Sequence, residues 1–142
     1  PYGAATATSL GCVPAISPSC APSALAGFGF EVRATNVLNA KPGILLFSTA
    51  GRAALPFQGG QLCVAPPVRR AAVQDSGGSA PPAADCTGAY SVDFNALLGP
   101  ASAWPDLAAG ARVWVQFWSR DPGFPAPDAS GLTDAIAFRV GW

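Results

Sequence analysis

Apolar and polar residues alternate along several short segments of the chain, which is the pattern of half-buried β-strands. In the segment 27–35, for example, Phe28, Phe30 and Val32 predict one buried face. Turn-forming Gly, Pro, Asn and Asp residues separate these segments from one another. The predicted strands cover residues 13–16, 27–35, 43–50, 61–65, 68–74, 90–94, 112–120 and 134–140. The segments 61–65 and 68–74 are one strand that Pro66 and Pro67 interrupt.

These strands predict an all-β fold, a single antiparallel β-sandwich of about seven strands over residues 27–142. Residues 1–26 are mostly small or polar and contain several prolines, so they predict an extended N-terminal arm. Between residues 95 and 107, Pro100 and Pro105 limit any helix to a short turn, because proline cannot continue a helix interior.

Composition excludes two kinds of partner. The 142 residues carry eight basic and eight acidic side chains, and the only basic doublet is Arg69-Arg70. Nucleic-acid binding needs clustered Lys and Arg, so no nucleic-acid partner is predicted. No apolar run approaches about 18 residues, so no transmembrane segment is predicted. The absence of Met, even at the start, indicates cleavage from a precursor, either as removal of a secretory signal or as trimming from a larger protein.

The four cysteines, Cys12, Cys20, Cys63 and Cys86, predict two disulfides and therefore a secreted or cell-surface location. Three pairings are possible, and the one that closes the shortest loops is Cys12–Cys20 with Cys63–Cys86. Without histidine and without a Cys-x-x-Cys pair, zinc is not indicated.

Catalytic chemistry is not predicted either. The chain has no histidine, so neither a Ser-His-Asp nor a Cys-His arrangement can form. A glycosidase would need two carboxylates about 5–9.5 Å apart in a pocket. Most acidic residues instead lie in turns or beside Gly and Pro, where aspartate commonly accepts local hydrogen bonds. We therefore expect a protein that is not an enzyme and has no cofactor.

One loop offers candidate ligands for calcium. Asp121, Asp128 and Asp134 bracket it, and calcium prefers carboxylate and carbonyl oxygens from loops. Their spacing matches no EF-hand, and turn capping explains the same residues more simply. No metal site is therefore predicted, and these three remain the candidates if one exists.

Aromatic residues provide the strongest binding candidates. Trp114, Gln116 and Trp118 share one face of the segment 112–120, with the tryptophans about 13 Å apart at the usual strand rise. If exposed, these rings and Tyr90 would form a platform that stacks on sugars, with Gln116 as a polar anchor. If covered, the same apolar area would belong to the core or to an interface with a neighbouring subunit.

Short motifs occur at intervals along most of the chain. They are Tyr2-Gly3, Ile44-Leu-Leu-Phe47, Pro56-Phe-x-Gly-Gly-x-Leu-Cys-Val64 with Arg69, Gly88-x-Tyr-Ser-x-Asp-Phe-Asn95, Val115-Gln-Phe-Trp-x-Arg-Asp-Pro122 and Gly131-Leu-Thr-Asp-Ala135. Together they resemble a module of secreted proteins from planctomycetes and related bacteria, which commonly closes large extracellular or surface proteins. The resemblance implies a β-rich, extracytoplasmic, non-catalytic module and assigns no functional residues.

Two functions follow from these expectations. The first is an extracellular structural or surface module that assembles with copies of itself or with other surface proteins, as a filament or surface-layer subunit. Zero net charge permits such association, and open sheet edges or the arm at residues 1–26 would supply the contacts. The alternative is a carbohydrate-binding module that holds glycans on its surface tryptophans.

Overall fold

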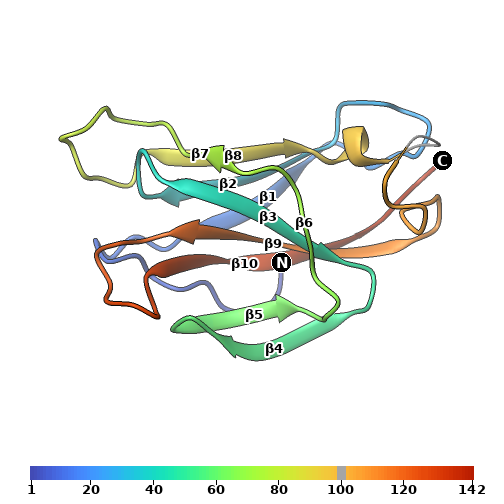
Figure 1. Ribbon diagram of the computed structural model, residues 1–142. Helices are drawn as coiled ribbons and strands as arrows, with labels where there is room; N and C mark the ends of the chain where they lie inside the picture. Colours follow the sequence, from blue (N-terminus) through green and yellow to red (C-terminus); the bar gives the residue numbers. More distant parts are fainter. Residues whose placement is uncertain (99–101) are drawn as a thin grey trace.

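Figure 1 shows the computed structural model, which describes residues 1–98 and 102–142 and consists mainly of antiparallel β-strands. The predicted all-β fold is therefore confirmed. The elements are β1 (Ala15–Ser19), β2 (Glu31–Val37), β3 (Pro42–Ser48), β4 (Arg52–Phe57), β5 (Gly60–Val64), β6 (Arg69–Arg70), β7 (Gln74–Asp75), β8 (Gly88–Asp93), the 3-10 helix η1 (Phe94–Leu97), β9 (Arg112–Arg120) and β10 (Ser130–Arg139).

Two sheets and a hairpin make up the molecule. The first sheet has the order β1-β2-β8, and the second has the order β10-β9-β3-β6, with β7 also paired to β3. All pairings within these sheets are antiparallel. The β4–β5 hairpin lies against the outer face of the second sheet, the face turned away from the first sheet (Figure 1).

The main hydrophobic core lies between the two sheets, and the alternation along the strands accounts for it. Val113, Val115 and Phe117 of β9 are buried on its inner face, as predicted. Phe30 and Phe94 each pack edge-to-face against Phe138, with ring centroids 4.8 and 5.1 Å apart. Burial of one such side chain stabilises the fold by roughly 1.5–3 kcal/mol, so this layer of side chains holds the two sheets together.

The N-terminal segment is part of the sandwich in this structure. Residues 15–19 form β1, an edge strand of the first sheet that pairs with β2. Upstream of it, Tyr2 exchanges two backbone hydrogen bonds with Ala135, at 2.7 and 2.9 Å, and the Thr6 amide donates to the Leu132 carbonyl at 2.8 Å. These contacts cover the outer edge of β10. If residues 1–26 extended away as the predicted arm, this edge would be open to a neighbouring subunit.

Two predicted strands differ from the structure in detail, and one strand was missed. Phe28 is 80% exposed instead of buried, because β2 starts only at Glu31 and Gly29, with φ near 103°, breaks the alternation. The predicted strand 68–74 is divided into β6 and the start of β7, and between them the Ala71 amide still donates to the Leu45 carbonyl of β3 at 3.0 Å. Strand β4 was not predicted, since its sequence RAALPF does not alternate and contains a proline.

The helical turn predicted after β8 is present as η1, which Asp93 caps by accepting a hydrogen bond from the Asn95 amide. Pro100, one of the two prolines expected to end this turn, lies outside the described residues. No helix within the described ranges is long and apolar enough to span a membrane.

The predicted disulfide pairing is wrong. The bond joins Cys12 to Cys86, whose Cα atoms are 6.3 Å apart, while Cys20 is a free exposed thiol and Cys63 a free buried one. The sheet explains this pairing: the Val13 carbonyl accepts from the side chain of Asn36 in β2, and the next residue of β2, Val37, pairs with Gly88 of β8. Cys12 and Cys86 therefore meet at the same end of the first sheet, although 74 positions separate them in the chain.

Candidate functional site

The outer face of the second sheet carries the residues singled out from the sequence. Because alternate side chains of β9 point into the core, Arg112, Trp114, Gln116 and Trp118 point outward together. The β4–β5 hairpin packs over the middle of this face, with Leu62 and Val64 buried against Leu46 and both tryptophans against the same cluster. The hairpin thus leaves one groove beside each tryptophan.

Gln116 is the residue that fastens the hairpin to the sheet. Its side chain is fully buried; Oε1 accepts from the Cys63 amide at 2.9 Å, and Nε2 donates to the carbonyls of Gln61 at 2.9 Å and Thr133 at 2.7 Å. Both amide hydrogens and one lone pair of the amide oxygen are thus used within the protein. The suggestion that Gln116 anchors a ligand is therefore wrong, because the protein's own hairpin occupies that position.

The hairpin has the geometry that this packing requires. Its two loop residues, Gln58 and Gly59, both have positive φ, which matches the twist of two-residue hairpin turns. At the next position, a Cβ on Gly60 would clash with the side chain of Thr6. The N-terminal segment therefore packs directly beneath the hairpin turn, and glycine permits this close approach.

Tyr90 belongs to the core and not to a surface platform. It is 1% exposed, stacks on Phe117 with ring centroids 5.7 Å apart, and donates its hydroxyl hydrogen to the Lys41 carbonyl at 2.8 Å. Burial raises the pKa of Tyr90 to about 12, so the hydroxyl stays protonated and keeps this hydrogen bond. The residue lies on the inner face of β8, where the alternation with Phe94 places it, so it cannot stack on a glycan.

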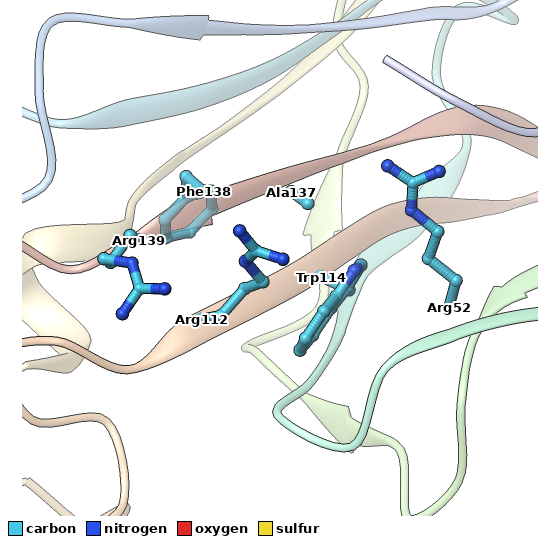
Figure 2. Close-up of a pocket in the computed structure, with 6 residues that line it drawn as sticks. All are labelled: Arg52, Arg112, Trp114, Ala137, Phe138 and Arg139. Carbon is cyan, nitrogen blue, oxygen red and sulfur yellow. The ribbon is translucent and has the colours of Figure 1, made fainter.

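The first groove, which we call the arginine groove, is lined by Arg52, Arg112, Trp114, Ala137, Phe138 and Arg139 and has a volume of about 540 Å³ (Figure 2). Arg112 and Arg139 are directly opposite partners across the β9–β10 ladder, and Ala137 is opposite Trp114. The small alanine leaves open space beside the indole. Figure 2 shows Arg112 between Arg139 and Trp114, with Arg52 of β4 on the other side of the indole.

Two of the three guanidinium groups are held by neighbours. Arg52 lies over the ring of Tyr2, 4.4 Å from its centroid, and Arg139 donates to the Gly110 carbonyl at 2.9 Å. Tyr2 is fixed in turn by its hydroxyl, which donates to the Cys63 carbonyl at 2.8 Å. Burial is the main cause that raises the pKa of Tyr2 to about 12, so this hydroxyl also stays protonated.

Among the residues that the structure describes, no acidic side chain lines the arginine groove. Within the described residues the ion pairs are Arg33–Glu31 and Arg69–Asp106, both away from this groove. Like charges directly opposite on a sheet are destabilising, and Arg112 and Arg139 form such a pair without a carboxylate to balance it. The groove is therefore a local concentration of positive charge on a chain of zero net charge.

Comparisons of the chain with family models, curated proteins and solved structures find no match.

The second groove, which we call the Trp118 groove, is mainly apolar. It is lined by Ile44, Leu46, Phe57, Gln58, Arg70, Val73 and Trp118 and has a volume of about 300 Å³. The indole nitrogen of Trp118 donates to Gln58 Oε1 at 2.9 Å, which ties the ring to the hairpin turn. A single guanidinium, that of Arg70, lines this groove. Trp114 and Trp118, both partly buried, thus do not form a continuous exposed row.

The three calcium candidates are not brought together. Asp121 is buried and accepts from the Ser9 amide at 2.7 Å, the Ser9 hydroxyl at 2.6 Å and the Gly123 amide at 3.1 Å. Asp134 accepts from the Ile16 amide at 3.0 Å, and Asp128 lies beside Gly59 at the hairpin turn. The described residues contain no group of three His, Cys, Asp or Glu side chains that could hold a metal ion. Asp121 and Asp134 instead dock the N-terminal segment onto the sandwich.

Proposed function

We propose that this chain is a non-enzymatic, extracytoplasmic module that binds carbohydrate in the arginine groove. The observation that carries the proposal is the partly buried indole of Trp114, which borders an open groove beside Ala137 and between guanidinium groups. An aromatic face offers apolar area to the C–H groups of a sugar ring, and the flanking guanidinium groups offer hydrogen bonds to its oxygens.

The groove is formed by rigid elements, which favours recognition of a ligand. Trp114 and Arg112 lie on β9, the strand that pairs with both β3 and β10, and Arg52 is held on the ring of Tyr2. Sites on paired strands hold their side chains more precisely than sites on loops. A volume of about 540 Å³ lies in the range of small-molecule sites, and it is large enough for a short stretch of sugar chain.

A binding role fits the chemistry of both grooves better than catalysis does. Neither lining contains a carboxylate, and the chain has no histidine, so neither groove offers a general acid–base pair. The Cys12–Cys86 disulfide supports an extracytoplasmic location, because such bonds persist in oxidising compartments.

Affinity electrophoresis of the purified chain through gels that contain soluble neutral or acidic polysaccharides tests this proposal. We expect retardation by at least one polysaccharide, and we expect Trp114→Ala to abolish it. Trp118→Ala is the matched control, since it removes the same ring from the same face of β9 on the other side of the hairpin. Retardation that depends on Trp118 and not on Trp114, or no retardation by any polysaccharide, would contradict the proposal.

Self-assembly is a second candidate, and one feature favours it. Within the described part of the chain, β4 pairs only with β5, and its Leu55 is 43% exposed, so its outer edge is available to another strand. The outer edge of β10 is covered by residues 2–6, which makes pairing there less favourable. Assembly through β4 would be weakened by Leu55→Lys, since an exposed charge blocks edge pairing.

Analytical ultracentrifugation at rising protein concentration separates the two candidates. If Leu55→Lys sediments as a monomer while the unaltered chain forms oligomers, assembly through β4 is supported. If both remain monomers at all concentrations, it is rejected. Deletion of residues 1–20 would not test assembly cleanly, because it would remove all of β1 and expose the edge of β10.

A further inference from the structure

We infer that the ligand of the arginine groove is an acidic polysaccharide whose sugars carry carboxylate groups. This inference rests on the proposed carbohydrate-binding function and narrows its ligand class. Three of the eight basic residues of the chain line this groove, and none of the eight acidic residues does. A neutral glycan would leave this concentration of positive charge without a partner.

The cross-strand pair of Arg112 and Arg139 is the central argument. Their backbones are direct partners in the β9–β10 ladder, which places two guanidinium groups on one face without an internal counter-charge. The Arg139 guanidinium has the Gly110 carbonyl as a partner, but the side chain of Arg112 makes no hydrogen bond or ion pair within the described residues. An anion between the two would relieve their repulsion and fill the unused donors of Arg112.

Guanidinium groups suit the carboxylate of a sugar acid on geometric grounds, as they suit other oxyanions with two accessible oxygens. The planar fork of arginine donates two parallel hydrogen bonds to the two oxygens of one carboxylate. Lysine, which binds anions as a point charge, is absent from the groove; the single lysine, Lys41, lies elsewhere. The donors are therefore those that planar, bidentate recognition requires.

The arrangement along the groove indicates a chain of sugars and not a single anion. Positive charges lie on both sides of the indole, Arg112 and Arg139 on one side and Arg52 on the other (Figure 2). Arg112 and Trp114 are two residues apart on β9, so their Cα atoms are about 7 Å apart, on the scale of one sugar unit. A sugar stacked on Trp114 would place the acid groups of its two neighbours within reach of guanidinium groups.

Nucleic acid would present phosphates at similar spacings, but two observations disfavour it. The chain has zero net charge and an isoelectric point near 6.6, so it lacks the broad positive field that nucleic-acid binding uses. Only one side chain in the groove, that of Trp114, is an outward-facing aromatic ring, whereas single-stranded nucleic acids are commonly held by a series of stacked bases. Single-stranded DNA is therefore the comparison ligand in the test.

Isothermal titration calorimetry with four probes tests the inference: polygalacturonate, its fully methyl-esterified form, a sulfated glycan such as dextran sulfate, and single-stranded DNA. We expect binding of polygalacturonate, weakened by added NaCl, and at least tenfold weaker binding of the ester, which lacks the charges. Replacing both Arg112 and Arg139 by Gln should weaken binding by at least about tenfold, the effect expected for loss of a charged hydrogen bond. Arg70→Gln in the Trp118 groove, which removes a comparable charge, should leave binding unchanged.

The outcomes separate this inference from the function on which it rests. Equal, Trp114-dependent binding of polygalacturonate and its ester would overturn the acidic-ligand inference and leave carbohydrate binding in place. Binding of dextran sulfate alone would also overturn the choice of carboxylate. Binding of DNA alone, or of none of the polysaccharides, would overturn both. Circular dichroism of each variant shows whether it is folded, and Arg112→Gln alone replaces the double variant if the latter does not fold.

Discussion

The arginine groove and the Trp118 groove lie on the same face of the same sheet, and each is built around one tryptophan of β9. Their linings differ in charge: three guanidinium groups surround Trp114, whereas one guanidinium and several apolar side chains surround Trp118. Two residues that are equivalent in the local pattern of the strand thus lie in surroundings of different chemistry. Strand alternation decides which face a side chain occupies, while neighbouring elements decide what that side chain can bind.

The β4–β5 hairpin divides this face into the two grooves, and the hydrogen bonds of Gln116 hold the hairpin on the sheet. Without the hairpin, Arg112, Trp114, Gln116 and Trp118 would form one continuous outward row on β9. With it, Gln116 is buried and the row is interrupted at its centre. Arg52 reaches the first groove only because β4 begins there, so the hairpin also supplies one of the three charges.

The largest expected effect is therefore that of Gln116→Leu, which keeps the approximate volume and removes the amide. It would leave the Cys63 amide and the carbonyls of Gln61 and Thr133 without their partner. At about 1 kcal/mol for each buried group, we expect a loss of about 3 kcal/mol in the free energy of unfolding. Urea denaturation followed by tryptophan fluorescence measures this loss.

Gln58→Leu is the matched control for this variant. It alters a glutamine in the hairpin turn itself, but Gln58 is exposed and its side chain makes one hydrogen bond, to the indole of Trp118. We expect its cost to stay below about 1 kcal/mol. If the two variants cost the same, the apolar contacts of Leu62 and Val64 hold the hairpin, and Gln116 does not.

The sequence was sufficient to predict the faces of β9, but not what covers them. Alternation placed Val113, Val115 and Phe117 inward correctly, since this property is local. The strand that packs on this face, β5, was predicted at 61–65, but its partner β4 has neither alternation nor a proline-free run, and no local signal placed the hairpin over β9. The disulfide failed for a related reason: loop length is a property of the chain, whereas the meeting of Cys12 and Cys86 depends on the pairing of β2 with β8.

The charge of the arginine groove was also beyond local prediction. Arg112 lies two residues before Trp114, so strand periodicity could have placed it beside the indole. The position of Arg139 opposite Arg112 depends on the register of β10, which shifts at an irregularity between Leu132 and Ala135. A shift of one residue turns every later side chain of a strand to the other face. Only the three-dimensional pairing therefore shows that the two charges meet.

A second prediction concerns pH and uses the absence of titratable carboxyl groups from the lining of the groove. Arginine stays charged at all accessible pH values, so while the protein stays folded, a loss of polygalacturonate binding in acid comes from protonation of the ligand's own carboxylates. The carboxyl groups of the ligand have a pKa near or just below 4. We expect constant affinity from pH 8 to about pH 5, and about tenfold weaker binding one pH unit below that pKa. Calorimetry across this range measures it, and a flat profile down to pH 3 would argue for a sulfated ligand.

This titration needs a check on the stability of the fold. The hydrogen bond from Arg69 holds the pKa of Asp106 below its ordinary value. A carboxyl with a lowered pKa in the folded state stabilises the fold above its unfolded pKa, and this contribution is lost as the pH falls through the folded pKa. Thermal unfolding at each pH therefore shows whether the protein is still folded where binding is lost. Asp106 lies outside both grooves, so Asp106→Asn should lower the melting temperature near neutral pH, converge with the unaltered chain in acid, and leave the binding profile unaltered.

The smallest expected effect bears most directly on the difference between the grooves. If Arg112 and Arg139 repel each other in the free protein, Arg112→Gln should raise the free energy of unfolding, by about 0.5 kcal/mol. Arg70→Gln, which has no direct arginine partner across its ladder, should not raise it. Added salt should stabilise the unaltered chain more than Arg112→Gln, because screening weakens the same repulsion. Equal or lower stability of Arg112→Gln at low salt would mean that the protein already balances these charges by itself, and the case for an anionic ligand in this groove would lose its electrostatic basis.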